Sequence, residues 1–255
     1  MLTWHVDIAM SKNPILVIHL IDHFYKMKKH IPNTLTLINL FCGSIAIPLV
    51  MMSFVDSAMI LVFVCLIADL LDGMVARWLH ADSPLGVQLD SLADVISFGL
   101  LPGVIIFYLL QRYGTGDISV GWTILAFLIP VSAALRLAKF NLDTRERTYF
   151  YGLPTPAGAL FAFGLLWMLL LPSTRWTDFF MHPFFLYGLI FALVALYHLP
   201  IQLPGFKGTR ASKGIIISLC IISVLLFFLQ KEIAIIVPAF IYVLVGLMHK
   251  IVKIY

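Results

Sequence analysis

Long apolar runs separated by short polar turns dominate the hydrophobic pattern of this chain. Runs of about 18 to 25 apolar residues are long enough to cross a bilayer as helices. The pattern predicts eight of them, at residues 34–54, 57–79, 86–110, 120–141, 154–172, 182–199, 213–230 and 232–250. Pro130 and Pro238 fall inside two of these runs and are expected to kink them. The pattern therefore predicts an all-α, polytopic membrane helix bundle.

The segment before the first run has a different pattern. Residues 14–30 place apolar side chains opposite histidines, lysines and an aspartate at helical spacing. Such a helix lies in the headgroup plane of a membrane, and a partly ordered basic tail is the alternative. The chain is accordingly divided into an amphipathic interfacial segment, 1–32, and a transmembrane domain, 33–255, in which no internal repeat is visible.

Composition and charge agree with a membrane protein. Of the 255 residues, 61% are hydrophobic and only 12% are charged, whereas a soluble domain averages about 25% charged residues. The net charge is +4. In a membrane protein a basic excess reports orientation and contact with anionic lipids, so no nucleic-acid partner is expected.

The basic residues are distributed unevenly between the two sides of the predicted bundle. Fourteen lysines and arginines fall on the side that holds both termini, and three, Arg112, Arg175 and Lys231, fall on the other. Both termini are therefore expected in the cytoplasm. The turn between the second and third runs lies on the same side. The predicted location is a prokaryotic inner (cell) membrane.

Four aspartates flank that turn. Asp69 and Asp72 are three residues apart at the end of the second run, and Asp90 and Asp94 are four apart at the start of the third. Residues at these spacings share one face of a helix, so two antiparallel neighbours bring all four carboxylates together. Like charges near a membrane need a neutralising cation. All-oxygen ligation favours Mg²⁺, Mn²⁺ or Ca²⁺.

Glycine and arginine residues accompany the aspartates. Gly73 and Gly86 let a ligand approach the backbone closely, and Arg77 is suited to pairing with phosphate. Together with a metal that stabilises a leaving group, they favour a diphosphate substrate. A cation transporter would explain the aspartates but not Arg77 or the glycines, and its site is expected nearer the midplane. A structural scaffold leaves the carboxylates unexplained.

Residues 69–94 carry the motif Asp69-x2-Asp72-Gly73-x2-Ala76-Arg77-x8-Gly86-x3-Asp90-x3-Asp94. The motif resembles, position for position, the signature of the CDP-alcohol phosphotransferase family. This resemblance implies a six-helix membrane core that is usually a homodimer. It also implies a divalent metal and transfer of a phosphatidyl-type group from a cytidine-diphosphate donor to an alcohol, with release of CMP.

The resemblance also implies roles for individual residues. It gives the metal to Asp69, Asp72, Asp90 and Asp94. Asp94 is in addition the expected base, because a hydroxyl is a weak nucleophile and a nearby carboxylate can take its proton. The residues implied to contact the donor, CDP-diacylglycerol, are Asn33, Thr36, Gly73, Ala76, Arg77, Ser83 and Gly86. Asn33 and Thr36 are also candidates for capping the first helix.

Further segments resemble the phosphatidylserine synthase branch of that family, whose acceptor is L-serine. They are residues 31–36, 136–141, 152–159 and 204–207. The implied acceptor contacts are Arg136, Lys139, Asn141 and Lys207. From the residues alone, Arg136 and Lys139 are better explained as anchors to lipid headgroups. Glycerol 3-phosphate and inositol phosphate stay open as acceptors, because Lys207 and Arg210 are suited to a phosphate.

Overall fold

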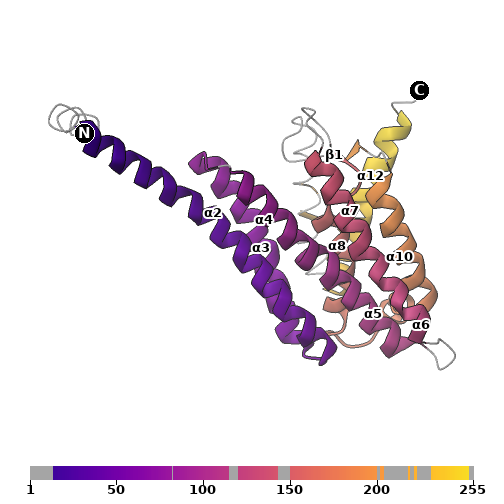
Figure 1. Cartoon of the computed structure of the whole chain (residues 1–255). Coiled ribbons are helices and arrows are strands. Elements are labelled where there is room, and N and C mark those ends of the chain that lie inside the picture. Colours follow the sequence, from indigo (N-terminus) through magenta and orange to yellow (C-terminus); the bar gives the residue numbers. More distant parts are fainter. Residues whose placement is uncertain are drawn as a thin grey trace.

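The computed structural model describes residues 14–81, 83–114, 120–142, 150–199, 202–203, 218, 221–222 and 231–252. Its principal helices are α2 (Pro14–Met51), α3 (Val55–Leu79), α4 (Pro84–Asp94), α5 (Leu101–Tyr113), α6 (Val120–Thr123), α7 (Leu128–Leu142), α8 (Thr155–Met168), α9 (Arg175–Phe180), α10 (Pro183–His198) and α12 (Ile236–Val252). Two short strands, β1 (Phe150–Tyr151) and β2 (Gln202–Leu203), pair antiparallel. The helices form one elongated bundle (Figure 1).

The predicted membrane character is confirmed. In the described part of the chain, four helical segments are long and apolar enough to cross a membrane: His30–Met51, Val55–Leu79, Pro84–Tyr113 and Gly121–Leu142. Three shorter apolar helices, Thr155–Met168, Pro183–His198 and Ile236–Gly246, coincide with three further predicted runs. Most of the run predicted at 213–230 lies outside the described residues.

The first helix differs from its prediction. α2 is continuous from Pro14 to Met51 and contains Pro32, so a helix start near residue 33 is wrong. A proline removes one backbone hydrogen bond, but the residues on both sides can keep the chain helical. Asn33 and Thr36 therefore lie within α2 and do not cap it. In Figure 1 the first half of α2 projects away from the bundle.

The two predicted proline kinks have different outcomes. Pro130 lacks the N–H that would bond to the carbonyl of Ala126, and a 3₁₀ turn occupies Ile124–Phe127 directly before α7. The 3₁₀ turn interrupts the α-helix just before Pro130, whereas a kink at Pro130 itself stays a prediction. Pro238 lies in the first turn of α12, where amide groups need no intrahelical acceptor. The kink predicted at Pro238 is wrong for that reason.

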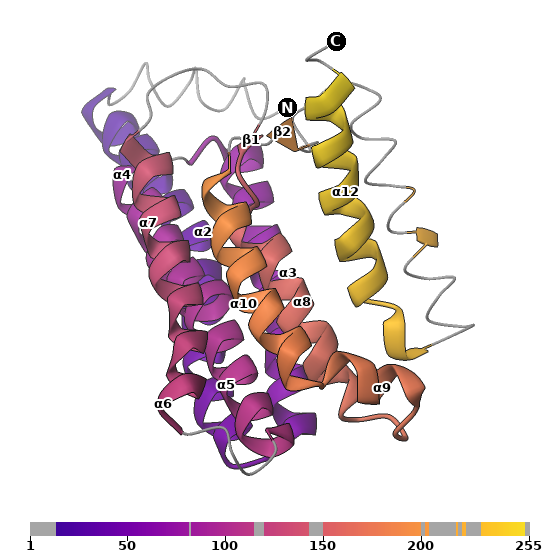
Figure 2. The ribbon, with the colours of Figure 1, turned by 90° about the vertical axis from the view of Figure 1, so that its right-hand side faces the viewer.

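The third span is the centre of the bundle. α4 and α5 join through a π-helical turn at Val95–Leu100, in which the amide of Leu101 bonds to the carbonyl of Ile96, five residues back. Its fully buried side chains include Phe98, Leu101, Ile105, Ile106 and Leu109. Figure 2 shows α10 and α8 beside this centre and α12 beyond them. A π turn within a helix often marks a functional site, and this one follows Asp94 directly.

Close packing of α2 against α3 and the π turn holds the acidic segment in place. The carbonyl of Asn39 accepts hydrogen bonds from Ser97 Oγ at 3.1 Å and from Cys65 Sγ at 3.4 Å. A Cβ on Gly43 would overlap Ser97 Oγ, so the missing side chain lets the two segments touch. α3 and the third span are thus both fixed to α2, which sets the ends of α3 and α4 side by side.

Candidate active site

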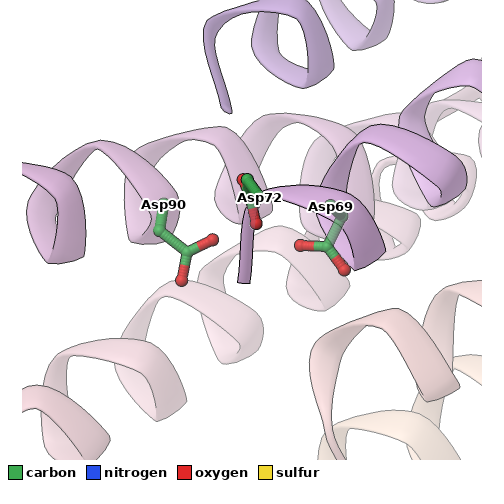
Figure 3. Close-up of side chains that lie close together, drawn as sticks. All are labelled: Asp69, Asp72 and Asp90. Atoms are coloured by element: carbon green, nitrogen blue, oxygen red, sulfur yellow. The ribbon is translucent and has the colours of Figure 1, made fainter. Parts of the chain in front are cut away.

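Three of the four motif aspartates converge. Asp69 and Asp72 come from α3 and Asp90 comes from α4. One carboxylate oxygen of each lies within 4.8 Å of the others. Figure 3 shows Asp72 between the other two, with all three side chains directed into one space. The donor set is all oxygen and its three charges have one sign. These residues fit a hard divalent cation.

A hydroxyl from α2 supports this group. Thr36 Oγ1 donates a hydrogen bond of 2.6 Å to Asp72 Oδ2, and both residues are buried. The bond fixes the orientation of the Asp72 carboxylate from the neighbouring helix. Partners of metal ligands typically contribute 10- to 100-fold to metal affinity. The family resemblance implies a donor contact for Thr36, and the structure adds this contact with a predicted metal ligand.

Replacing Thr36 by valine should weaken the metal site without removing a ligand. Valine keeps the shape of threonine but cannot donate to Asp72, so we expect the apparent affinity for Mn²⁺ to fall roughly 10- to 100-fold. Titration of activity with Mn²⁺, together with Mn²⁺ binding followed by electron paramagnetic resonance, measures this shift. The matched control is Thr34→Val, because Thr34 is exposed and bonds only to the carbonyl of His30. Equal metal affinity in both variants would contradict the prediction.

A cavity of about 170 Å³ opens beside the three carboxylates. It brings together α2, the end of α3, the α3–α4 turn and the start of α4. All seven residues predicted to contact the donor line it, together with two of the metal-group aspartates and three neighbours: Pro32, Asn33, Thr36, Asp72, Gly73, Ala76, Arg77, Ala81, Ser83, Gly86, Val87 and Asp90. The cavity thus combines small residues, carboxylates and one arginine.

Hydrogen bonds on both sides hold the α3–α4 turn, which forms one wall of the cavity. His80 adopts a left-handed conformation (φ 49°), and the amides of His80 and Ala81 bond back to Arg77 and Ala76. This pattern ends a helix and satisfies its last carbonyls. Ser83 then caps α4, because its Oγ accepts the amide of Gly86 at 3.0 Å. Ser83 therefore has a structural role in addition to its place in the cavity.

Gly86 on α4 lies close to Asn33 on α2. A Cβ there would lie 3.1 Å from both Asn33 Oδ1 and Ser83 Oγ, so the cavity wall would have to shift by a few tenths of an ångström. We expect Gly86→Ala to raise the KM for a CDP-linked donor roughly 3- to 10-fold. Stability should not fall, because alanine favours helix over glycine by roughly 0.5–1 kcal/mol.

Steady-state kinetics and thermal unfolding of the purified variant measure these two effects separately. Gly188→Ala is the matched control, because Gly188 is also helical and a Cβ there meets nothing within 4 Å. An unchanged donor KM in Gly86→Ala would show that the close approach does not shape the cavity.

The fourth motif aspartate, Asp94, lies beside Asp69, although it is not one of the three carboxylates that all lie within 4.8 Å of one another. It is buried in the last turn of α4, and its Oδ2 accepts a hydrogen bond of 3.2 Å from Thr155 Oγ1 at the start of α8. Among the described residues its Oδ1 has no hydrogen-bond partner. Asp94 is therefore oriented by one hydroxyl and keeps one free acceptor oxygen, an arrangement suited to receiving a proton.

The predicted acceptor residues have different environments. Arg136 is buried in α7, and its Nε has no hydrogen-bond partner within the described ranges. Lys139 and Asn141 are exposed, and Asn141 Nδ2 donates a hydrogen bond of 2.8 Å to Ser91 Oγ on α4. Lys207 lies outside the described residues. Arg136 is thus the one of the three described residues whose surroundings require a ligand or another partner.

Two residues near Asp94 escaped the sequence reasoning. Thr155 lies in a segment whose resemblance to a family branch was noted, but its bond to Asp94 joins residues 61 positions apart. Tyr197 is buried near the end of α10, inside a predicted apolar run. A polar residue inside an apolar run was the available signal for both.

Comparison with known proteins decides the family. The family model described as CDP-alcohol phosphatidyltransferase matches residues 29–200, which include the whole motif and most of the bundle. The chain belongs to this family. The matched region contains every described residue of the cavity and of the acidic group, and it ends before α12.

Several curated relatives are named CDP-diacylglycerol–serine O-phosphatidyltransferase. That of Helicobacter pylori strain J99 is 33% identical over 199 residues, covering 77% of this chain and 81% of that protein. The relative from Mycobacterium leprae is 35% identical over 153 residues, which cover 57% of this chain and 49% of that protein. The relative from Bacillus subtilis is 34% identical over 127 residues, which cover 50% of this chain and 70% of that protein. The matched region thus spans about half the length of the mycobacterial relative.

Proposed function

We propose that this protein transfers the phosphatidyl group of CDP-diacylglycerol to L-serine, forming phosphatidylserine and releasing CMP. The observation that carries the proposal is the cavity in which seven expected donor contacts meet Asp72 and Asp90. Membership of the CDP-alcohol phosphatidyltransferase family supports the reaction type. The serine acceptor is supported by the names of the relatives.

In this proposal the donor diphosphate occupies the cavity. Gly73 and Gly86 leave room for it, and Arg77 at the exposed rim pairs with a phosphate oxygen. Asp69, Asp72 and Asp90 hold the divalent metal, with Thr36 orienting Asp72. The metal, Mg²⁺ or Mn²⁺, would supply charge stabilisation for the diphosphate and its departing oxygen; Ca²⁺ is a possible occupant of the same ligands.

Asp94 is proposed as the general base. The serine hydroxyl oxygen forms a bond to the phosphorus of the phosphatidyl group, the bond from that phosphorus to the CMP oxygen breaks, and the hydroxyl proton moves to Asp94. The free Oδ1 of Asp94 and the bond from Thr155 to its Oδ2 support this role. General-base catalysis typically contributes 10²- to 10⁴-fold to the rate. Because Asp94 lies beside Asp69, it is also proposed as a metal ligand, as the family resemblance implies.

The acceptor is proposed to bind through Arg136. Its guanidinium is buried near Asp94, and a carboxylate would supply the partner that Nε lacks. Lys139, Asn141 and Lys207 are proposed as further acceptor contacts on the family resemblance alone. In the described part of the chain Arg136 is the one buried arginine, which suits an amino acid better than glycerol 3-phosphate or inositol phosphate, whose dianionic phosphate would attract several cations.

The membrane arrangement is also proposed in its finer detail. Eight spans around a six-helix core, a homodimer and an interfacial segment at 1–32 follow from the hydrophobic pattern and the family resemblance. The α3–α4 turn, the end of α7 and the end of α12 lie at the same end of the bundle (Figure 1). The excess of basic residues supports a cytoplasmic location for this end, in a bacterial inner membrane.

The proposal is tested with purified, detergent-solubilised protein, CDP-diacylglycerol and Mn²⁺ or Mg²⁺. L-serine, glycerol 3-phosphate and inositol phosphate are supplied separately, and CMP release is measured. Of the three alcohols, only L-serine is expected to cause CMP release. Release with glycerol 3-phosphate but not serine would keep the reaction type and overturn the acceptor. Metal uptake into proteoliposomes without CMP release would overturn both in favour of a cation transporter.

A further inference from the structure

Three buried polar side chains next to the metal group each keep an atom without a hydrogen-bond partner in the described part of the chain. They are Asp94 Oδ1, Arg136 Nε and Tyr197 Oη. The side chains are only 7%, 8% and 2% exposed, respectively. An unpaired buried polar group costs about 1–3 kcal/mol, and folded proteins contain few of them. Three in one place indicate a ligand that supplies the missing partners.

Helix α8 brings the Asp94 and Tyr197 atoms to one face. Thr155, in its first turn, donates to Asp94. Gly158, three residues later and on the same face, lies against the Tyr197 hydroxyl, which any Cβ at that position would overlap. The hydroxyl of Tyr197 thus lies one turn of α8 from the carboxylate of Asp94.

Helix α7 adds the Arg136 guanidinium. A Cβ placed on Gly99, just beyond Asp94, would lie 3.3 Å from the Cβ of Ala133. Arg136 is one turn further along α7, and the ionisable groups within electrostatic range of its guanidinium are Tyr197, Asp94 and Tyr242. The guanidinium, the carboxylate and the phenol therefore form one group, which we call the Asp94–Arg136–Tyr197 cluster.

The chain around Tyr197 is held firmly. The amide of Leu153 donates a hydrogen bond of 2.9 Å to the carbonyl of Leu196. Gly152 has φ +77°, and a Cβ there would lie 2.5 Å from the carbonyl oxygen of Tyr197. The segment leading into α8 is therefore docked on the end of α10. This docking fixes the Tyr197 hydroxyl relative to Thr155 and so to Asp94.

We propose that Tyr197 selects an amino acid as acceptor by accepting a hydrogen bond from its ammonium group. The three unpaired atoms match the three polar groups of serine: Arg136 Nε donates to the carboxylate, Asp94 Oδ1 faces the hydroxyl, and Tyr197 Oη faces the ammonium. This inference rests on the proposed function for its substrate. Sites built to bond a polar group reject analogues that lack it, so Tyr197 is a specificity-determining residue.

The test compares Tyr197→Phe with wild type in the serine reaction. We expect the KM for serine to rise roughly 10-fold, as for one lost hydrogen bond to a charged group, with the KM for CDP-diacylglycerol unchanged. The probe for the amino group is 3-hydroxypropionate, which is serine without its ammonium, measured as a competitive inhibitor. Its Ki should not change in Tyr197→Phe, because it makes no bond to Tyr197.

Tyr187→Phe is the matched control. Tyr187 lies on the same helix and also has a buried hydroxyl without a partner, but it is almost three turns from Tyr197, and its KM values and Ki should equal those of wild type. An unchanged serine KM in Tyr197→Phe would overturn the inference, as would equal rises in the serine KM and the Ki. Wild-type protein that releases CMP with another alcohol and not with serine would overturn the proposed function, and this inference with it.

Discussion

Asp94→Asn should bind CDP-diacylglycerol normally and lose turnover. Asparagine has the shape of aspartate, and its carboxamide oxygen can still accept the hydrogen bond from Thr155. It cannot take a proton from the acceptor hydroxyl. We therefore expect kcat to fall roughly 10²- to 10⁴-fold. The Kd for the donor, measured by equilibrium binding in the presence of Mn²⁺, should stay within about two-fold of wild type.

Asp178→Asn is the control for this experiment, because Asp178 is an exposed residue in the first turn of α9, away from the cavity. Its activity should equal that of wild type. Rapid turnover by Asp94→Asn would remove Asp94 from the role of base. Loss of donor binding together with turnover would instead assign Asp94 to the metal group.

Asp90→Asn should behave in the opposite way and lose both metal and donor. Asp90 belongs to the three carboxylates that lie within 4.8 Å of one another, and it also lines the cavity. A neutral amide is a weaker ligand for a hard cation. We expect turnover to fall roughly 10³-fold or more, equivalent to about 4 kcal/mol in the activation barrier.

The measurement pairs Mn²⁺ binding by electron paramagnetic resonance with donor binding in the same preparation. Both should weaken in Asp90→Asn, and excess Mn²⁺ should restore part of the activity. Asp56→Asn, an exposed substitution at the far end of α3, should change neither. Wild-type Mn²⁺ affinity in Asp90→Asn would contradict the metal role, whatever happens to activity.

The positions of the helices could be predicted from the sequence because the bilayer imposes their length. Apolar runs predicted helices that coincide with α3, with the third span and with the segment Gly121–Leu142, to within a few residues. The converging aspartates were also predictable, since spacings of three and four residues place side chains on one helix face. Local rules suffice for both features.

Contacts between distant residues could not be predicted in this way. The bond from Thr155 to Asp94 and the position of Tyr197 depend on how α8 and α10 pack against the third span. The continuation of α2 through Pro32 was missed because a proline disfavours a helix locally, whereas surrounding residues decide the outcome. The π turn after Asp94 likewise has no simple signature in the sequence.

We propose that the acidic group and the neighbouring Asp94–Arg136–Tyr197 cluster act together to join serine to a phosphatidyl donor. The most direct measurement follows radiolabelled L-serine into chloroform-soluble lipid, together with CMP, in the presence of CDP-diacylglycerol. Labelled phosphatidylserine and CMP should appear in equal amounts and only when Mn²⁺ or Mg²⁺ is present. Label that stays in the aqueous phase while CMP is released, or transfer that continues after complete chelation of divalent metal, would contradict the account.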